Sequence, residues 1–207
     1  MISLRKLIDK IKCNNPKYYT AFLIIFFGIY FIIGSNIYKD YGISTDEYFQ
    51  MTNGYVNIKY IAEIFGIEEV VNHLYKVPDL NYYDDRDHGS SFEIILVGLE
   101  YLLDVDEVRN KFLLRHYSVF LTFFLSVIFF YFLIYCLYKN WYFSFLGDFF
   151  LILSPRIFAH SFYNTKDLIA LCSVIFCSFT FFRLIDKKTY WNSVIPVSYT
   201  HLRAHET

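Results

Sequence analysis

Apolar segments recur along the chain and alternate with segments that are rich in charged residues. Three of them, Tyr18–Ile37, Tyr117–Tyr138 and Leu168–Ile185, have about the 20 residues that cross a bilayer as a helix. A fourth, Trp141–Pro155, is shorter and contains Asp148, for which we expect a local polar contact. The pattern predicts an all-α integral membrane protein with about four transmembrane helices.

A fifth apolar segment, Ser91–Leu103, is too short to span and contains Glu93 and Glu100. Its apolar positions recur at helical spacing, and they are Phe92, Ile95, Leu96, Leu99, Leu102 and Leu103. The segment is typical of an amphipathic helix that lies on the membrane surface.

Basic residues predict the orientation of the spans. They gather in an N-terminal arm (residues 1–17), at Lys139 and in the stretch from Arg183 to Lys188. With four spans, all three places face the cytoplasm, and Lys139 occupies a tight turn there. The long loop from Tyr38 to about Arg115 and the short loop Arg156–Asp167 then lie outside. We expect a multi-pass protein of the bacterial inner membrane with a cytoplasmic N-terminus.

Composition agrees with a membrane protein. Of the 207 residues, 56% are hydrophobic and 22% aromatic, which is too apolar for an ordinary soluble domain. The net charge of -1 provides no basic field for a nucleic acid. The four cysteines, one in the basic arm and three in apolar segments, indicate no disulfide framework.

The first outer loop opens with Ser44-Thr45-Asp46-Glu47. Ser44 and Glu47 have the spacing of a capping box at a helix start. An apolar stripe follows at helical spacing: Tyr48, Met51, Tyr55, Ile58, Ala62 and Phe65. Asp46 is either a first-turn acid that favours the helix dipole or a general base at the membrane surface. The cap accounts for Glu47 better than for Asp46.

Two further groups in this loop are candidates for binding. Arg86 and His88, which precede the surface helix, either belong to a solvated loop or hold a phosphate or sugar hydroxyl. Arg115 and His116 open the second span, where a cation either anchors the helix or meets a lipid phosphate. A packed, hydrogen-bonded His116 is a better interpretation than a metal ligand.

The short outer loop is dense in functional groups, namely Arg156, His160, Asn164, Lys166 and Asp167. We expect Pro155 to end the preceding helix and Thr165 to cap the next one. Either these groups only anchor and cap, or the cations and the helix N-terminus form a phosphate site. The native part of the chain has no metal-ligand spacing and no evident cofactor, and nothing supports a divalent metal.

Taken in order, these motifs resemble one family. The acidic pair, the Arg-Asp-His-Gly stretch, the Arg-His pair and Ser-Pro-Arg-x-x-x-His-Ser-x-x-Asn-x-Lys-Asp look like the integral-membrane GT-C glycosyltransferases of the family 39 type. These are related to protein O-mannosyltransferases and aminoarabinose transferases. The resemblance covers about residues 15–190, only the N-terminal part of such enzymes. The Lys-Pro-Pro motif of some aminoarabinose transferases is absent, and His88-Gly89-Ser90-Ser91 stands in its place.

The resemblance implies inverting transfer of a sugar from a polyprenyl-phosphate-linked donor to a glycan, lipid or protein acceptor on the outer face. It maps the essential acid to Asp46, with Glu47 beside it. The loop Arg156–Asp167 would lie near the donor phosphate. Arg86, His88, Arg115 and His116 complete the residues expected to bind substrate. The alternatives are a membrane transporter and a non-catalytic assembly protein.

The last residues are set apart from this organisation. We divide the chain into the basic arm 1–17, a membrane domain 18–195 and a tail 196–207. The tail resembles translated sequencing adapter, which would make the chain a truncated fragment that is inactive as given. His201 and His205 lie in this tail and are not treated as a metal site.

Overall fold

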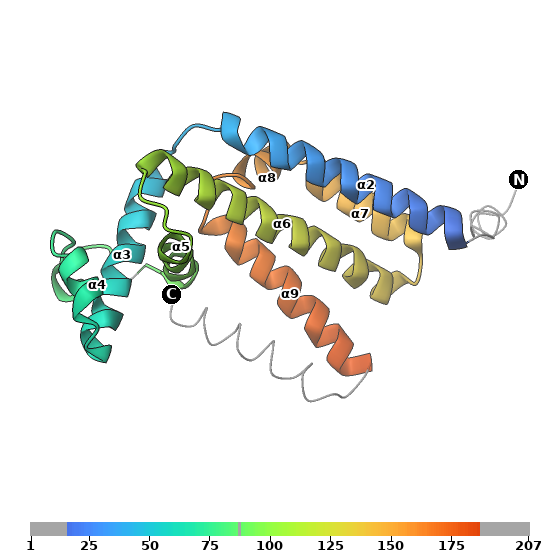
Figure 1. Cartoon of the computed structure of the whole chain (residues 1–207). Coiled ribbons are helices and arrows are strands. Elements are labelled where there is room, and N and C mark those ends of the chain that lie inside the picture. The colour runs from blue at the N-terminus through green and yellow to red at the C-terminus, as the bar shows by residue number, and fades with distance from the viewer. Residues whose placement is uncertain (1–15, 87, 187–207) are drawn as a thin grey trace, which may run out of the picture. The chain divides into compact units, whose positions relative to one another are not determined.

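The computed structural model describes residues 16–86 and 88–186, which contain helices and no strand (Figure 1). The predicted all-α fold is therefore confirmed. The proposed tail, residues 196–207, and the basic arm before Pro16 lie outside the described residues. The chain divides into two compact units, residues 1–37 and 38–207.

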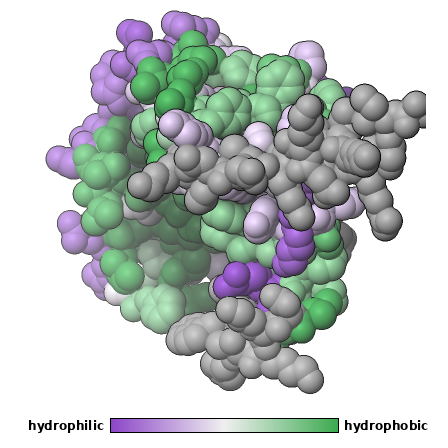
Figure 2. Space-filling view, turned by 90° about the vertical axis from the view of Figure 1, so that its right-hand side faces the viewer, coloured by the Kyte–Doolittle hydropathy of each residue, from purple (hydrophilic) through white to green (hydrophobic). Residues whose placement is uncertain are grey.

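Three helices are long and apolar enough to cross a membrane, and they cover Tyr18–Asp40, Val108–Tyr138 and Asp167–Ile185. In the first unit this helix is α2 (Pro16–Ile37), with exposed apolar side chains such as Ile24, Ile25 and Ile32. Figure 2 shows hydrophobic side chains over much of one face of the molecule. An exposed apolar surface of this kind is compatible with a lipid bilayer around a multi-pass protein.

The second unit is built around α6 (Val108–Tyr138), which packs against α7 (Trp141–Leu153) and α9 (Asp167–Asp186) (Figure 1). Its 31 residues rise about 46 Å, well beyond the ~30 Å hydrocarbon core. The helix starts nine residues before Tyr117, where the sequence predicts the span to begin. Its first turns therefore extend the span and carry Lys111, Arg115 and His116.

The third predicted span, Trp141–Pro155, corresponds to a single helix that is shorter than the three long apolar helices, and a second short helix lies in the predicted outer loop. α7 has 13 residues, and α8 (Pro155–His160) follows directly after Ser154. Pro155 occupies the first turn of α8, as a proline can. The turn before α7 is tight, as predicted, with Lys139 at φ 51°. Because Phe162 stacks on Phe120 with ring centroids 5.5 Å apart, α7 and α8 together return the chain along the apolar length of α6.

α9 then runs back along α6. The ring of Phe129 on α6 lies 5.0 Å from Phe176 and 5.2 Å from Phe179, measured between centroids. α9 therefore starts near Phe120 and passes toward the end of α6 that carries Tyr138. The end of α6 near Val108 and the loop before α9 consequently share one side of the helical unit, which we call the outer end after the orientation that the sequence predicts.

The segment between the first two spans folds into one long helix and several short ones. It contains η1 (Tyr38–Asp40), α3 (Thr45–Phe65), α4 (Glu68–His73), η2 (Leu80–Tyr82) and α5 (Ser91–Leu102). Gly66, at φ 68°, ends α3 in the left-handed conformation that favours glycine. α3 packs against α5, and α5 in turn contacts α6. The helix predicted over Ser91–Leu103 is thus present as α5, and its place on a membrane surface stays a prediction.

Polar side chains make up part of the buried faces of both α3 and α5. The apolar stripe predicted for α3 is only partly correct, because Met51 and Ala62 are buried but Tyr48 and Phe65 are exposed. The buried face of α3 also includes Glu47, Asn53 and Lys59. On α5, Glu93 and Glu100 are buried together with Leu96 and Val97, whereas Ile95, Leu102 and Leu103 are exposed. α5 therefore turns its acids inward and much of its apolar surface outward.

Candidate functional site at the outer end

The start of α3 is a capping box, as the sequence predicts. Ser44 has extended backbone angles, and its N–H donates to Glu47 Oε1 over 2.6 Å. Asp46 lies in the first turn and is exposed, whereas Glu47 is only 3% exposed. The two adjacent carboxylates therefore differ in environment: Asp46 faces outward and Glu47 points into the protein.

Glu47 has a second partner that spacing does not indicate. Its Oε2 lies 2.7 Å from Nε2 of His116, which is 69 residues further along the chain and 2% exposed. The contact joins α3 to α6, and it confirms a packed, hydrogen-bonded His116. The other ring nitrogen, Nδ1, has no hydrogen-bond partner among the described residues.

Arg115, the neighbour of His116, joins α6 to α5. Its Nε lies 2.8 Å from Glu100 Oε1, and its Nη1 donates to Glu93 Oε2. All three side chains are nearly inaccessible, at 4% exposure or less. Arg115 is therefore enclosed by two carboxylates, and direct contact with a lipid phosphate would require this network to open.

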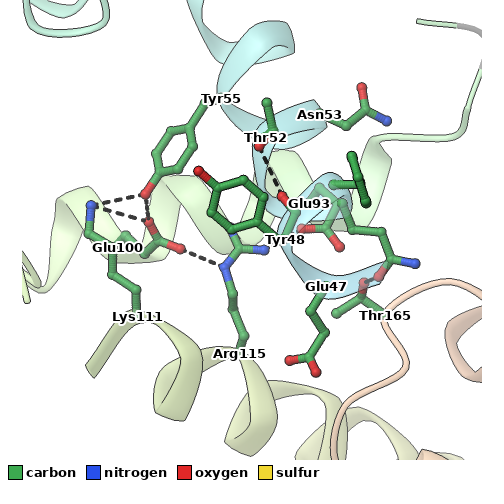
Figure 3. A network of polar contacts seen from close by, with 12 residues as sticks. Glu47, Tyr48, Thr52, Asn53, Tyr55, Glu93, Glu100, Lys111, Arg115 and Thr165 are labelled. Atoms are coloured by element: carbon green, nitrogen blue, oxygen red, sulfur yellow. Dashed lines mark hydrogen bonds and ion pairs between the residues drawn. The ribbon is translucent and has the colours of Figure 1, made fainter. Parts of the chain in front are cut away.

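Tyr55 and Lys111 extend the network toward the surface (Figure 3). The Tyr55 hydroxyl donates to Glu100 Oε2, and Lys111 Nζ lies 2.9 Å from the same hydroxyl and 3.8 Å from that carboxylate oxygen. Burial raises the pKa of Tyr55 above its ordinary value, and the hydrogen bond to Glu100 raises it further. The phenol therefore remains a hydrogen-bond donor at neutral pH.

A small pocket of about 40 Å³ lies at this edge of the network. Its lining combines the network residues Tyr55, Glu100 and Lys111 with His73, Tyr101, Asp104, Val105 and Asp106. This volume suits a few waters rather than a sugar. Within residues 16–86 and 88–186, no group of three or more His, Cys, Asp or Glu side chains could hold a metal.

The short outer loop lies against the start of α3. Thr165 donates to Gln50 Oε1 on α3, and Phe162 stacks on Tyr41 with centroids 4.5 Å apart. These contacts bring the predicted cluster Arg156–Asp167 to the same place as Ser44–Glu47 and His116. Three clusters that are far apart in the sequence thus meet at the outer end.

Within this loop, Asn164 rather than Thr165 caps α9, so the predicted cap is wrong. Asn164 Oδ1 accepts from the N–H groups of Lys166 and Asp167 at 3.0 and 2.7 Å. Its Nδ2 lies 2.8 Å from His160 Nδ1 and 3.3 Å from Asp167 Oδ2. The Asn164 side chain therefore occupies two amides that a phosphate at this helix N-terminus would use.

Exposed charges surround this outer end. Arg156, Lys166 and Asp167 are exposed. Arg86 is also exposed and donates to the Asn81 carbonyl. The His88 carbonyl accepts from Asn53 Nδ2 on α3 over 3.2 Å, and the His88 ring lies 3.9 Å from Asp85 Oδ1. Arg86 and His88 are both exposed, unlike the buried side chains of Glu93, Glu100 and Arg115.

Asp148 has a different setting from the one expected. It is fully buried in α7, and neither carboxylate oxygen has a hydrogen-bond partner among the described residues. The predicted local polar contact is therefore wrong. An acid in an apolar helix is costly and is a functional candidate by default.

Sequence reasoning missed the buried acids Glu93 and Glu100 as part of the site. They are seven residues apart and so share one helix face, the face that also carries Leu96 and Val97. Two acids on one face of an apolar helix, followed within 22 residues by the cations Lys111 and Arg115, could have indicated buried ion pairs from the sequence.

Comparisons with models of protein families, with curated proteins and with solved structures give no match. The fold defines the class to which the chain belongs, an all-α protein with three long apolar helices and a multi-pass arrangement compatible with a lipid bilayer.

Proposed function

We propose that the chain is, or forms part of, a membrane glycosyltransferase that takes a sugar from a polyprenyl-phosphate-linked donor. The acceptor is a glycan, lipid or protein at the outer face of a bacterial inner membrane, and the N-terminus is cytoplasmic. One observation carries the proposal: an exposed Asp46 sits beside a buried, doubly bonded Glu47, where two outer loops and a spanning helix meet.

In this proposal the Asp46 carboxylate accepts the proton of an acceptor hydroxyl. The oxygen then attacks the anomeric carbon from the side opposite the phosphate. The bond from that carbon to the phosphate oxygen breaks, and the polyprenyl phosphate leaves with the electron pair. Inversion at the anomeric carbon follows from attack on the opposite side.

The leaving phosphate needs positive charge close to it. Arg156 and Lys166 are exposed in the loop that contacts α3 and suit this role. Arg115 and His116, which sequence reasoning placed among the binding residues, suit a supporting role better because both are 2% exposed and already bonded.

The test is donor turnover by membranes that contain the chain, with tritiated polyprenyl-phosphate mannose and aminoarabinose as donors. We expect Asp46→Asn to lower the rate by about 10²–10⁴-fold, which is the usual contribution of a general base. The matched control is Asp40→Asn, since Asp40 is also exposed and lies in η1, and it should leave turnover unchanged. Normal turnover by Asp46→Asn would refute the base, and no turnover by the wild type would refute glycosyl transfer by this chain on its own.

Asp148 favours a second candidate, a transporter. Its buried carboxylate in α7, which has no hydrogen-bond partner among the described residues, is the kind of group that marks an ion or proton pathway. Flux in proteoliposomes that disappears in Asp148→Asn would support this function. Equal flux by wild type and variant, at the level of empty vesicles, would exclude it.

A further inference from the structure

We infer that Glu47 and His116 form a latch that fixes the start of α3, and with it Asp46, to the outer end of α6. The inference rests on the proposed function for its catalytic consequence, but its structural part does not. His116 is thereby a positioning residue: it touches Glu47, and it acts on the reaction only through the place it gives to Asp46.

Glu47 uses its two oxygens for two different purposes. Oε1 accepts from the Ser44 N–H at 2.6 Å, which holds the extended residue before the helix. Oε2 lies 2.7 Å from His116 Nε2. One carboxylate therefore connects the cap of α3 to a residue of the spanning helix.

A cap alone does not account for this arrangement. A capping box needs one oxygen and leaves the other to water, yet Glu47 is 3% exposed. A buried carboxylate oxygen without a partner is costly, and His116 supplies that partner. The imidazole in turn has no other polar partner among the described residues, because its Nδ1 is unbonded. The packing of His116 thus serves this single contact.

The contact has a direct effect on Asp46 because the two acids are consecutive. Loss of the His116 contact leaves Glu47 Oε2 buried and unpaired, so Glu47 would turn toward water and release the Ser44 N–H. The first turn of α3, which carries Asp46, would then loosen. A displacement of about 1 Å of a reacting group can lower a rate by about 100-fold.

Two measurements on the whole chain test the latch. The first is hydrogen exchange of the backbone amides in residues 41–50, followed by mass spectrometry in detergent. The second is kcat and KM for the polyprenyl-phosphate sugar. The variants are His116→Leu, which removes the contact, and His116→Gln, whose amide can still donate to Glu47. His73→Asn is the control, because His73 is an exposed residue of α4 that contacts the ring of Tyr101.

We expect His116→Leu to raise exchange in residues 41–50 by about tenfold or more, as for the loss of a hydrogen bond to a charged group. It should lower kcat and leave the donor KM nearly unchanged. His116→Gln should restore both quantities toward wild type, and His73→Asn should change neither. If His116→Leu does not insert into the membrane, Glu47→Gln replaces it, because it keeps the cap acceptor and weakens the contact with His116.

The outcomes separate the latch from the proposed function. Unchanged exchange in His116→Leu, or identical behaviour of His116→Leu and His116→Gln, overturns the latch. Raised exchange together with a wild type that turns over no donor supports the latch and refutes glycosyl transfer by this chain on its own. Raised exchange with a normal kcat refutes the positioning role.

Discussion

Gly54 sets how closely α3 can approach α5. A Cβ at this position would lie 3.0 Å from Val97 Cγ2, 3.1 Å from Glu93 Cβ and 3.1 Å from the Glu93 carbonyl oxygen. Carbon atoms normally meet at about 3.5–4.0 Å, so the substitution Gly54→Ala forces a separation of about half an ångström. The nearby atoms include the backbone of α5, which cannot turn aside as a flexible side chain can.

The magnitude follows from two opposing terms. Overpacking of this kind costs about 1–3 kcal/mol, whereas replacing glycine by alanine inside a helix stabilises it by about 0.5–1 kcal/mol. Gly98→Ala on α5 is the matched control, because a Cβ at Gly98 meets nothing within 4 Å. Both variants gain the same helix preference, so the difference between them isolates the packing cost. We expect Gly54→Ala to be the less stable by about 1–3 kcal/mol.

The assay is the free energy of unfolding of the purified chain in detergent, measured for wild type and both variants under one set of conditions. A displaced α5 would also move Glu93 relative to Arg115. We therefore expect Gly54→Ala to make the unfolding transition less cooperative, because α3 and α5 would be less tightly coupled. Equal stability of Gly54→Ala and Gly98→Ala would refute the close approach of α3 and α5, whatever the absolute values.

Two further variants test the buried network. Arg115→Met leaves the carboxylates of Glu93 and Glu100 buried without their cation, and we expect a loss of about 3–5 kcal/mol in thermal unfolding; a stability equal to wild type would contradict the ion pairs. Tyr55→Phe removes the hydroxyl that links Glu100 to Lys111, with an expected loss of about 1–3 kcal/mol. Since the folded protein raises the pKa of Tyr55, this advantage of the wild type should be full below about pH 10 and fall at higher pH, and an advantage that grows with alkaline pH would contradict it.

Hydropathy predicts the bilayer-crossing part of each helix but not its ends. The sequence places the second span at Tyr117, whereas α6 begins at Val108. The added turns are charged, and charge marks the limit of the hydrocarbon region rather than the end of the helix. Their cations are stabilised by partners on α5 and α3, which the local sequence does not reveal.

The polar face of α3 is hard to predict for the same reason. Lys59 is 8% exposed because its Nζ lies 2.6 Å from Asp79 Oδ1 and 2.8 Å from the Val77 carbonyl oxygen. Asp79 lies 20 residues and Val77 18 residues along the chain from Lys59. A hydropathy pattern assigns apolar residues to the buried face, and it therefore wrongly predicts that Tyr48 and Phe65 are buried.

Local chemistry, by contrast, is predictable where the partners are close in sequence. Ser44 and Glu47 are three residues apart, and the capping box they predict is present. The same logic fails for Thr165 because Asn164 competes for the same amides, and Thr165 instead bonds Gln50, 115 residues away. Long-range contacts decide which of two neighbouring caps is used.

Arg115 and His116 show how one end of a spanning helix can organise the outer segment. Consecutive residues on a helix point about 100° apart, so Arg115 faces Glu93 and Glu100 of α5 while His116 faces Glu47 of α3. Buried ion pairs of this kind add little net stability, because desolvation offsets attraction. They do, however, penalise any arrangement in which a carboxylate is buried without its cation. The hypothesis that follows is that these pairs fix the register of α3 and α5 on α6, while the close approach at Gly54 supplies the packing. Exchanging the charges of Arg115 and Glu100 should then preserve the fold better than reversing either one alone.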